Sequence, residues 1–296
     1  WPPPGGGRAL ALVRPASTAE GAEVLKACHD QGQTGVTHGG LTGLVGGAIT
    51  GPDEIAISLE RMNRMEAVDT VNRTLTVDAG VPIQRIQEAA EAEGFLFPLD
   101  FGARGSAHIG GAISTNAGGN SVIRYGMTRE QLLGIEAVLA DGTIISSMKD
   151  VIKNNTGYDL KQLFVGSEGT LGIVTRAVLR LRPAPRSQNT ALVAIDSFAK
   201  LASFLQAMDT ALGGTLSAFE VMWNDFFTLI VPGDEKHSVS LADSHAFYVL
   251  LESTGGQQEG DTQRFEEALQ EAFDQELVAD AIVAQSKQQR QDLWAI

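Results

Sequence analysis

The chain has 296 residues, of which 43% are hydrophobic and 20% are charged, as is typical of a globular protein long enough for two domains. Its formal net charge of −14 argues against nucleic acid and anionic lipid as partners, because both require clustered Lys and Arg. No apolar run reaches the length of a membrane span, and a single cysteine, Cys28, excludes an internal disulfide framework. Because Cys28 lies in a helical pattern without an evident partner, we expect a buried thiol there.

Strand and helix patterns alternate through the first half of the chain. Strands are predicted at 10–13, 35–37 and 55–59, a helix at 18–31 that ends at Gly32, hairpins at 65–80 and 135–147, and a helix that begins at Pro82 and ends at Gly94. Asp141-Gly142 suits the turn of the second hairpin. This order predicts an α+β domain over residues 8–184, which ends in the Pro183–Pro185 segment.

The pattern changes after Pro185. Residues 190–196, 218–223 and 245–253 read as strands, and two amphipathic helices accompany them. The clearer helix covers 261–277, where apolar residues recur every four positions. We expect residues 186–296 to form a second domain, an antiparallel sheet with helices. The chain ends inside an apparent helix, so we also expect this domain to be truncated.

Residues 38–47, HGGLTGLVGG, form the first of two glycine-dense loops. Gly39, Gly40 and Gly43 allow consecutive backbone N–H groups to surround anionic oxygens, and Thr42 adds a hydroxyl. The loop lacks the lysine of a Walker A motif, and a strand rather than a helix follows, unlike a Rossmann fingerprint. A glycine-rich surface turn is the alternative interpretation.

Residues 98–119, PLDFGARGSAHIGGAISTNAGG, hold six glycines and only two charged side chains, Asp100 and Arg104. The segment is too glycine-rich for a packed helix and too apolar for a solvated linker. Glycine is used where the backbone turns sharply or approaches something closely. Together the two loops indicate a cofactor with a phosphate end and a flat ring end. Arg104 is equally consistent with a surface charge.

A third glycine-rich segment, 153–183, places Glu168 between Gly166, Gly169 and Gly172 before a β-branched strand. Glu168 is either solvated or holds the loop in shape. With RYG at 124–126, the three segments closely resemble the FAD-linked oxidases of the vanillyl-alcohol-oxidase superfamily. Within this superfamily, the motif sequences are most similar to those of the D-2-hydroxyglutarate and D-lactate dehydrogenase branch.

The resemblance implies a two-subdomain FAD-binding domain of the PCMH type, followed by a partial ferredoxin-like cap domain. It implies FAD contacts from Gly39, Gly40, Leu41, Thr42 and Gly43 at the pyrophosphate, from Gly105, Ser106, Gly110, Gly111, Thr115, Asn116 and Gly118 along the isoalloxazine and ribityl chain, and from Tyr125, Gly126, Glu168, Ile173 and Val174 around the rest of the pocket. Relatives with covalent flavin carry a histidine where this chain has Leu41, so non-covalent FAD is expected. No metal site is expected.

The resemblance further implies oxidation of a D-2-hydroxy acid of the D-2-hydroxyglutarate or D-lactate/glycolate class, with a hydride passing to the flavin. The family's carboxylate-binding Arg and catalytic histidines fall beyond Ile296, so no catalytic residue is assigned, and the 296 residues alone are expected to bind FAD without turnover. Other readings are a sugar or alditol oxidoreductase of the same superfamily, or an FAD-binding module without catalysis. The electron acceptor (quinone, flavoprotein or oxygen) and a homodimer stay open. We expect a cytoplasmic protein, with peripheral membrane association as an alternative.

Overall fold

The computed structural model describes residues 8–231 and 241–296, which divide into two compact units. The first unit contains the chain up to Gly119 together with Gly126–Ala184, and the second contains Asn120–Tyr125 together with the chain from Pro185 onward. The short segment Asn120–Tyr125 therefore belongs, by its contacts, to the unit that the rest of the chain builds after Pro185. The two domains expected from the sequence, 8–184 and 186–296, assign this short segment to the first domain instead.

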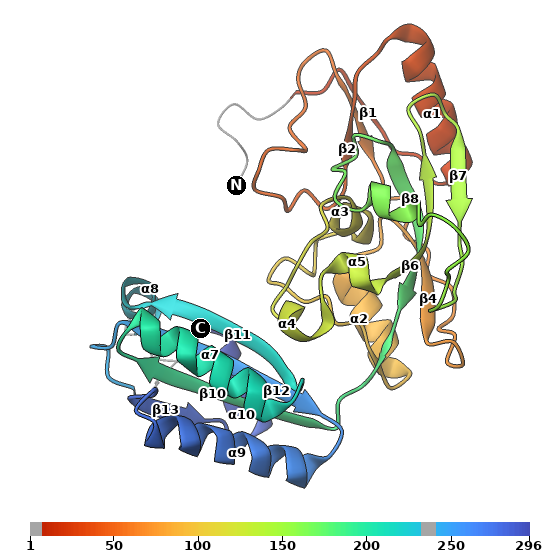
Figure 1. Cartoon of the computed structure of the whole chain (residues 1–296). Coiled ribbons are helices and arrows are strands. Elements are labelled where there is room, and N and C mark those ends of the chain that lie inside the picture. Colours follow the sequence, from red (N-terminus) through yellow and green to blue (C-terminus); the bar gives the residue numbers. More distant parts are fainter. Residues whose placement is uncertain (1–7, 232–240) are drawn as a thin grey trace. The chain divides into compact units, whose positions relative to one another are not determined.

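The first unit begins with a parallel sheet of three strands. These are β1 (Ala11–Val13), β2 (Gly35–His38) and β3 (Ile55–Ser58), in the order β1-β3-β2, with α1 (Thr18–Gln31) joining β1 to β2 (Figure 1). Ser17 begins α1 by accepting a hydrogen bond from the backbone of Glu20, and Gly32 ends it with a left-handed φ of 63°. Cys28 is buried on this helix, as expected.

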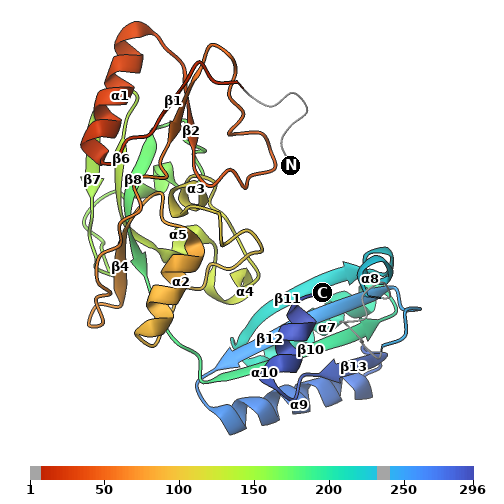
Figure 2. The same cartoon turned by 180° about the vertical axis from the view of Figure 1, so that it is seen from behind.

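The second sheet of this unit is antiparallel. It contains β4 (Thr74–Asp78), β6 (Leu132–Val138), β7 (Ile144–Ser147) and β8 (Ile173–Arg180), in the order β4-β8-β6-β7. Helix α1 packs against β6 (Figure 2). The predicted hairpin at 135–147 is confirmed as β6 and β7. That at 65–80 is less regular, because its first arm joins the second only through isolated bridges, Met65 to Val77 and Asp69 to Thr74.

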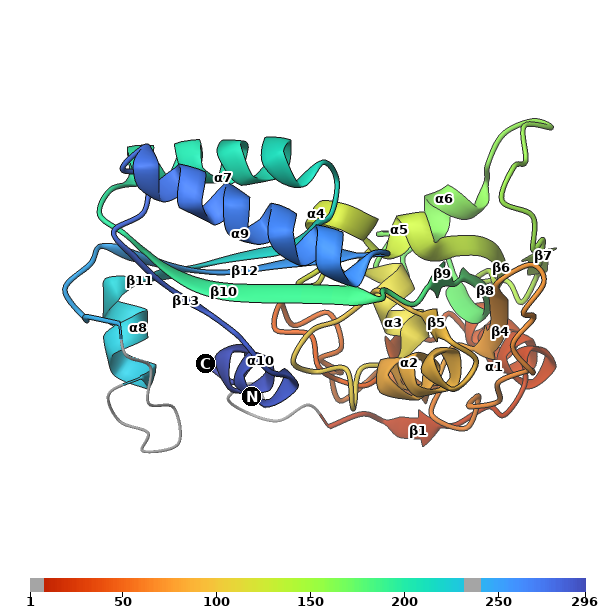
Figure 3. The ribbon, with the colours of Figure 1, turned by 90° about the horizontal axis from the view of Figure 1, so that it is seen from below.

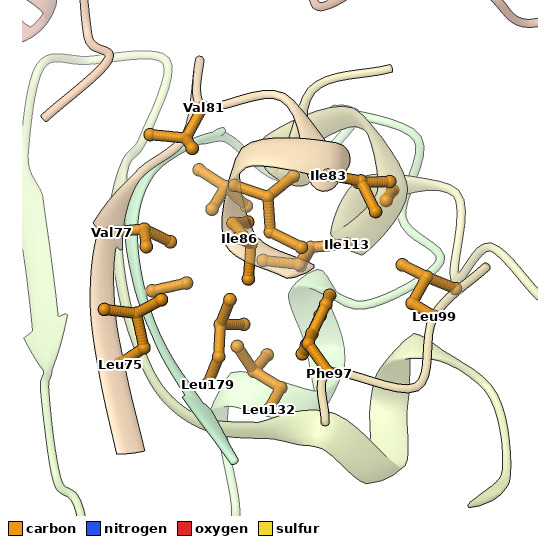
Figure 4. Packing of buried hydrophobic residues seen from close by; sticks show 14 of the residues in the cluster. Leu75, Val77, Val81, Ile83, Ile86, Phe97, Leu99, Ile113, Leu132 and Leu179 are labelled. Carbon is orange, nitrogen blue, oxygen red and sulfur yellow. The ribbon is translucent and has the colours of Figure 1, made fainter. Parts of the chain in front are cut away.

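Helix α2 (Ile83–Ala92) packs its apolar face into the main core of the unit (Figure 4). Leu75, Val77 and Leu179 from the antiparallel sheet meet Ile83 and Ile86 there, and all five are almost fully buried. Each such side chain contributes about 2 kcal/mol of hydrophobic stabilisation. A small pairing of β5 (Phe95–Leu96) with β9 (Arg182–Pro183) lies at the end of the unit.

Four short helices lie in and between the glycine-rich segments 98–119 and 153–183. They are α3 (Ile109–Ser114), α4 (Val122–Tyr125), α5 (Thr128–Gln131) and α6 (Lys161–Phe164). The expectation that residues 98–119 are too glycine-rich for a packed helix is therefore wrong for α3. Ile109 and Ile113 are fully buried, and Gly110 lets the helix approach Ala79, whose Cβ would lie 2.6 Å from a Cβ at that position.

The second unit has a ferredoxin-like order of strands and helices. Its elements are β10 (Ser187–Ile195), α7 (Phe198–Leu212), β11 (Leu216–Trp223), α8 (Asn224–Ile230), β12 (Phe247–Gly255), α9 (Gln258–Asp274), β13 (Asp280–Val283) and α10 (Lys287–Trp294). The strands form one antiparallel sheet in the order β11-β12-β10-β13. Helices α7 and α9 cover one face, and α8 and α10 lie on the other (Figure 3). In the described parts of both units, no helix combines the length and apolar character needed to span a membrane.

Candidate functional site

A cavity of about 370 Å³ lies in the first unit, within the size range of small-molecule sites. Three segments far apart in sequence form its walls: the loop after β2, the loop that contains α3, and the start of β8. The lining residues are Thr37, Gly39, Gly40, Leu41, Thr42, Gly43, Val45, Gly47, Ala48, Leu59, Phe101, Ala103, Ala107, His108, Gly110, Gly111, Ala112, Ser114, Thr115, Ala117, Gly118, Glu168, Gly169, Gly172, Ile173 and Val174.

The loop after β2 supplies unpaired backbone donors. Among the described residues, none is found that accepts a hydrogen bond from the backbone N–H groups of Gly39–Gly43. The loop is fixed at its two ends, since His38 Nε2 lies 2.8 Å from the Thr50 hydroxyl and Ile49 donates to the carbonyl of Gly46. A fixed loop with free N–H groups is suited to the oxygens of a phosphate.

The α3 loop is held against the core by its own backbone. Ile109 donates to the Val81 carbonyl and Gly110 to the Ala79 carbonyl. The hydroxyls of Ser114 and Thr115 donate to carbonyls one turn earlier in α3, at 2.8 and 2.9 Å. These hydroxyls therefore keep only their acceptor positions for a ligand.

The third wall docks on the end of α3. The backbone of Glu168 donates to the Ser114 carbonyl at 2.8 Å, and that of Gly166 to the Ile113 carbonyl at 3.1 Å. Glu168 has a positive φ of 53°, which turns the chain sharply between its neighbouring glycines. Glu168 therefore shapes the loop, and its exposed side chain lines the cavity. Its expected contact to FAD stays a prediction.

Twelve of the residues expected to contact FAD line the cavity: Gly39, Gly40, Leu41, Thr42, Gly43, Gly110, Gly111, Thr115, Gly118, Glu168, Ile173 and Val174. Gly105, Ser106, Asn116, Tyr125 and Gly126 are not among the lining residues. Tyr125 belongs to the second unit, where α4 packs against β11.

Ser106 and Asn116 do not line the cavity and instead contact other parts of the protein. A Cβ at Gly40 would lie 1.9 Å from the Ser106 carbonyl oxygen, so this glycine allows the two loops to touch. The Asn116 side chain accepts a hydrogen bond from the backbone of Arg129 at 3.0 Å. The guanidinium of Arg129 in turn donates to the carbonyls of Gln162 and Val165. This network ties the α3 loop to the segment that carries Glu168.

His108 lines the cavity but was not expected there from the sequence. Its Nδ1 is buried without a hydrogen-bond partner among the described residues, and burial holds the pKa of His108 below its ordinary value. A single histidine within an apolar motif gives no local sequence signal that it lines a cavity. Only the neighbourhood created by the fold reveals it.

The cavity fits the group that the resemblance implies. Cβ atoms at Gly43, Gly111 and Gly169 would meet nothing within 4 Å, so the backbone is open toward a ligand at these positions. Phe101, Leu59 and Ile173 add apolar walls, and the free N–H groups of Gly39–Gly43 add donors. A phosphate-bearing cofactor with a flat apolar ring matches this donor set.

Comparisons with known proteins agree with this chemistry. Residues 9–147 match the family described as "FAD binding domain", and residues 184–296 match "FAD linked oxidases, C-terminal domain". Among solved structures, alkyldihydroxyacetonephosphate synthase aligns with a TM-score of 0.76 at 20% identity over 96% of this chain and 53% of that chain, which is a likeness of fold.

Curated relatives named D-2-hydroxyglutarate dehydrogenase align over nearly the whole chain. The mitochondrial protein of Arabidopsis thaliana is 37% identical over 98% of this chain and 52% of its own length. That of Bos taurus is 38% identical over 98% and 53%, and that of Xanthomonas citri pv. viticola is 38% identical over 97% and 60%.

The chain thus spans little more than half the length of these relatives. Two of their names specify mitochondria, so the expected cytoplasmic location gains no support from them. The matches to the two families meet in one chain, in the same order as the two units. The chain therefore combines an FAD binding domain with a C-terminal domain of the FAD-linked oxidase type, and its cofactor is FAD.

Proposed function

We propose that the protein containing this chain oxidises a D-2-hydroxy acid to the corresponding 2-oxo acid. The observation that carries the proposal is 37–38% identity to D-2-hydroxyglutarate dehydrogenases over almost the whole chain. D-2-hydroxyglutarate is the first substrate to test, followed by D-lactate and glycolate. A sugar or alditol as substrate is the alternative within the superfamily.

We propose the cavity of the first unit as the FAD site. Bound FAD supplies a two-electron acceptor for the alcohol carbon of the substrate. The free N–H groups of Gly39–Gly43 support a role in holding the phosphates, and the open faces of Gly111 and Gly169 leave room for the ring. The apolar walls at Phe101 and Ile173 support exclusion of water from the ring.

Non-covalent attachment is part of the proposal. Leu41 lines the cavity at the position where covalent relatives carry a histidine, and a leucine side chain cannot form a bond to flavin. Acid precipitation of the FAD-loaded chain should leave a colourless pellet and a yellow supernatant. A yellow pellet would contradict this attachment.

The substrate test uses the protein at its natural full length. D-2-hydroxyglutarate or D-lactate, added without oxygen, should bleach the flavin absorbance, whereas the L enantiomers should not. Bleaching by an alditol or sugar alone would favour the alternative substrate class. A flavin that no hydroxy acid reduces would favour a binding module. A homodimer and a location in the cytoplasm or at a membrane surface stay predictions. The electron acceptor stays open between a quinone, a flavoprotein and oxygen.

A further inference from the structure

The lining of the cavity is poor in positive charge. Among the described residues that line it, only His108 and Glu168 have titratable side chains, and none is Lys or Arg. The diphosphate of FAD carries two negative charges, and the chain as a whole has a net charge of −14. Backbone N–H groups supply only partial charges, so among the described lining residues His108 alone has a side chain that can carry a full positive charge.

His108 lies next to the loop with the free donors. A Cβ at Gly39 would be 3.9 Å from the Cβ of His108 and 3.6 Å from the Cα of Gly111. The first residue of the donor loop therefore touches the same turn of chain that carries His108. This neighbourhood assigns His108 to the phosphate end of the cofactor.

The surroundings of His108 in the free protein favour a neutral ring. Nδ1 is a buried polar atom without a partner among the described residues, which is rare in native proteins. Burial lowers the pKa of His108, while the Glu60 carboxylate raises it more weakly. Glu60 is itself paired with Arg14 at 2.8 Å. Glu168, the carboxylate of the third wall, is the other acidic group of the cavity.

We propose that His108 is the charge partner of the FAD diphosphate, its imidazole taking up a proton as the cofactor binds and donating a hydrogen bond to a phosphate oxygen. The inference rests on the assignment of this cavity to FAD. Because the bound form favours the protonated ring, the pKa of His108 is higher in the complex than in the free chain. FAD affinity therefore increases as the pH falls from the higher of these two values to the lower.

The test measures dissociation constants for FAD, ADP and riboflavin on the 296-residue chain, between about pH 5.5 and pH 8.5. His108→Gln keeps a polar side chain but cannot take up a proton. It should weaken FAD and ADP by about tenfold or more near the acid end, as expected for loss of a charged hydrogen bond. Riboflavin, which has no phosphate, should bind equally to both proteins, and the pH slope for FAD should disappear in the variant.

Arg104→Gln is the matched control. It removes a permanent positive charge from the same loop, but Arg104 pairs with Asp100 at 2.7 Å and is not a lining residue. FAD affinity in this variant should stay within about twofold of the unmodified chain, because an exposed ion pair contributes little.

Two results would overturn the inference while leaving the FAD site intact. One is an equal loss of riboflavin and FAD binding in His108→Gln, which would indicate a packing role. The other is an unchanged affinity and pH slope for FAD. An unmodified chain that binds neither FAD nor ADP would instead remove the cofactor assignment, and the inference with it.

Discussion

Gly110 and Gly111 are neighbours in α3, yet a side chain would meet different surroundings at the two positions. At Gly110 a Cβ would lie 2.6 Å from the Ala79 Cβ, whereas at Gly111 it would meet nothing within 4 Å. Both glycines line the cavity. The sequence identifies both as unusual, but only the fold separates the glycine that packs against the protein core from the one that is open toward the cavity.

Gly110→Ala should therefore lower the free energy of unfolding by about 1–3 kcal/mol, because α3 must move away from Ala79. Gly111→Leu should fold with little loss of stability but bind FAD at least about tenfold more weakly, because its side chain enters the cavity. Denaturant unfolding of the free chain and flavin titration measure the two effects. Full FAD affinity in folded Gly111→Leu would show that the ligand does not use this space.

Asn116 illustrates a residue whose importance was expected for another reason. The resemblance implies a contact from Asn116 to FAD, whereas in the structure its side chain accepts a hydrogen bond from the backbone of Arg129 and its φ is +48°. Asparagine tolerates this backbone region better than other non-glycine residues. Whether it also reaches FAD stays a prediction, and the structure supplies a second reason for the residue type.

Among the elements, α9 depends on a buried carboxylate at its start. Asp261 accepts hydrogen bonds from the Ser187 hydroxyl at 2.6 Å and from the backbone of Gln257 at 2.8 Å. The hydrogen bond from Ser187, and after it the one from Gln257, holds the pKa of Asp261 below its ordinary value. The ionised side chain therefore stabilises the fold above the unfolded-state pKa, and this stabilisation is lost as the pH falls through the folded-state pKa.

Asp261→Asn should reduce the free energy of unfolding by about 1–2 kcal/mol at neutral pH, because two hydrogen bonds lose their charged acceptor. The difference from the unmodified chain should shrink below about pH 4, where the aspartate is protonated as well. Urea unfolding across this range, followed in the second unit, provides the measurement. A difference that grows on acidification would contradict the assigned direction.

Helix α4 anchors the excursion Asn120–Tyr125 to the second unit. Arg124 donates to the carbonyl and hydroxyl of Thr254 and, at 3.4 Å, to the carbonyl of Thr215. Its guanidinium also lies over the ring of Tyr125, 5.1 Å from the centroid. Residues 120–125 directly follow the α3 loop, which lines the cavity. Arg124 therefore anchors the segment that leaves the cavity wall.

Arg124→Gln should increase hydrogen exchange in residues 121–126, because the neutral side chain loses most of these contacts. Peptides from α2, which lies in a separate core, serve as the internal reference and should exchange as before. Unchanged protection of residues 121–126 would show that packing of α4 against β11, rather than Arg124, holds the segment.

Elements with strong local signals were predictable from the sequence. Gly32 marks the end of α1, and Asp141-Gly142 marks the turn between β6 and β7. Helix α3 was not predictable, because glycines disfavour a helix and its stability comes from contacts with distant residues such as Ala79. The high glycine content that identifies the walls of the site is also what argues against a helix at α3. The position of His108 in the cavity could not be predicted, because it depends on which distant segments the fold brings together.

At the scale of the whole molecule, the two units have separate hydrophobic cores. Ile83, Ile86 and Leu179 belong to a core of the first unit, and Phe204, Phe265 and Leu269 to a core of the second. Every residue that lines the cavity belongs to the first unit. A ligand of this cavity can therefore stabilise the first core directly.

Thermal unfolding of the chain should accordingly show two transitions, of which FAD raises only one. Binding to the folded state alone adds RT ln(1 + [FAD]/Kd), or about 2.7 kcal/mol at a concentration of a hundred times Kd. Tryptophan reports mainly on the second unit, since Trp223 and Trp294 lie there and Trp1 lies outside the described residues. The tryptophan transition should keep its midpoint, while the transition that releases flavin fluorescence moves upward with FAD concentration. If both midpoints rise together, the two units unfold as one cooperative body, and the segment anchored by Arg124 is the first place to look for the coupling.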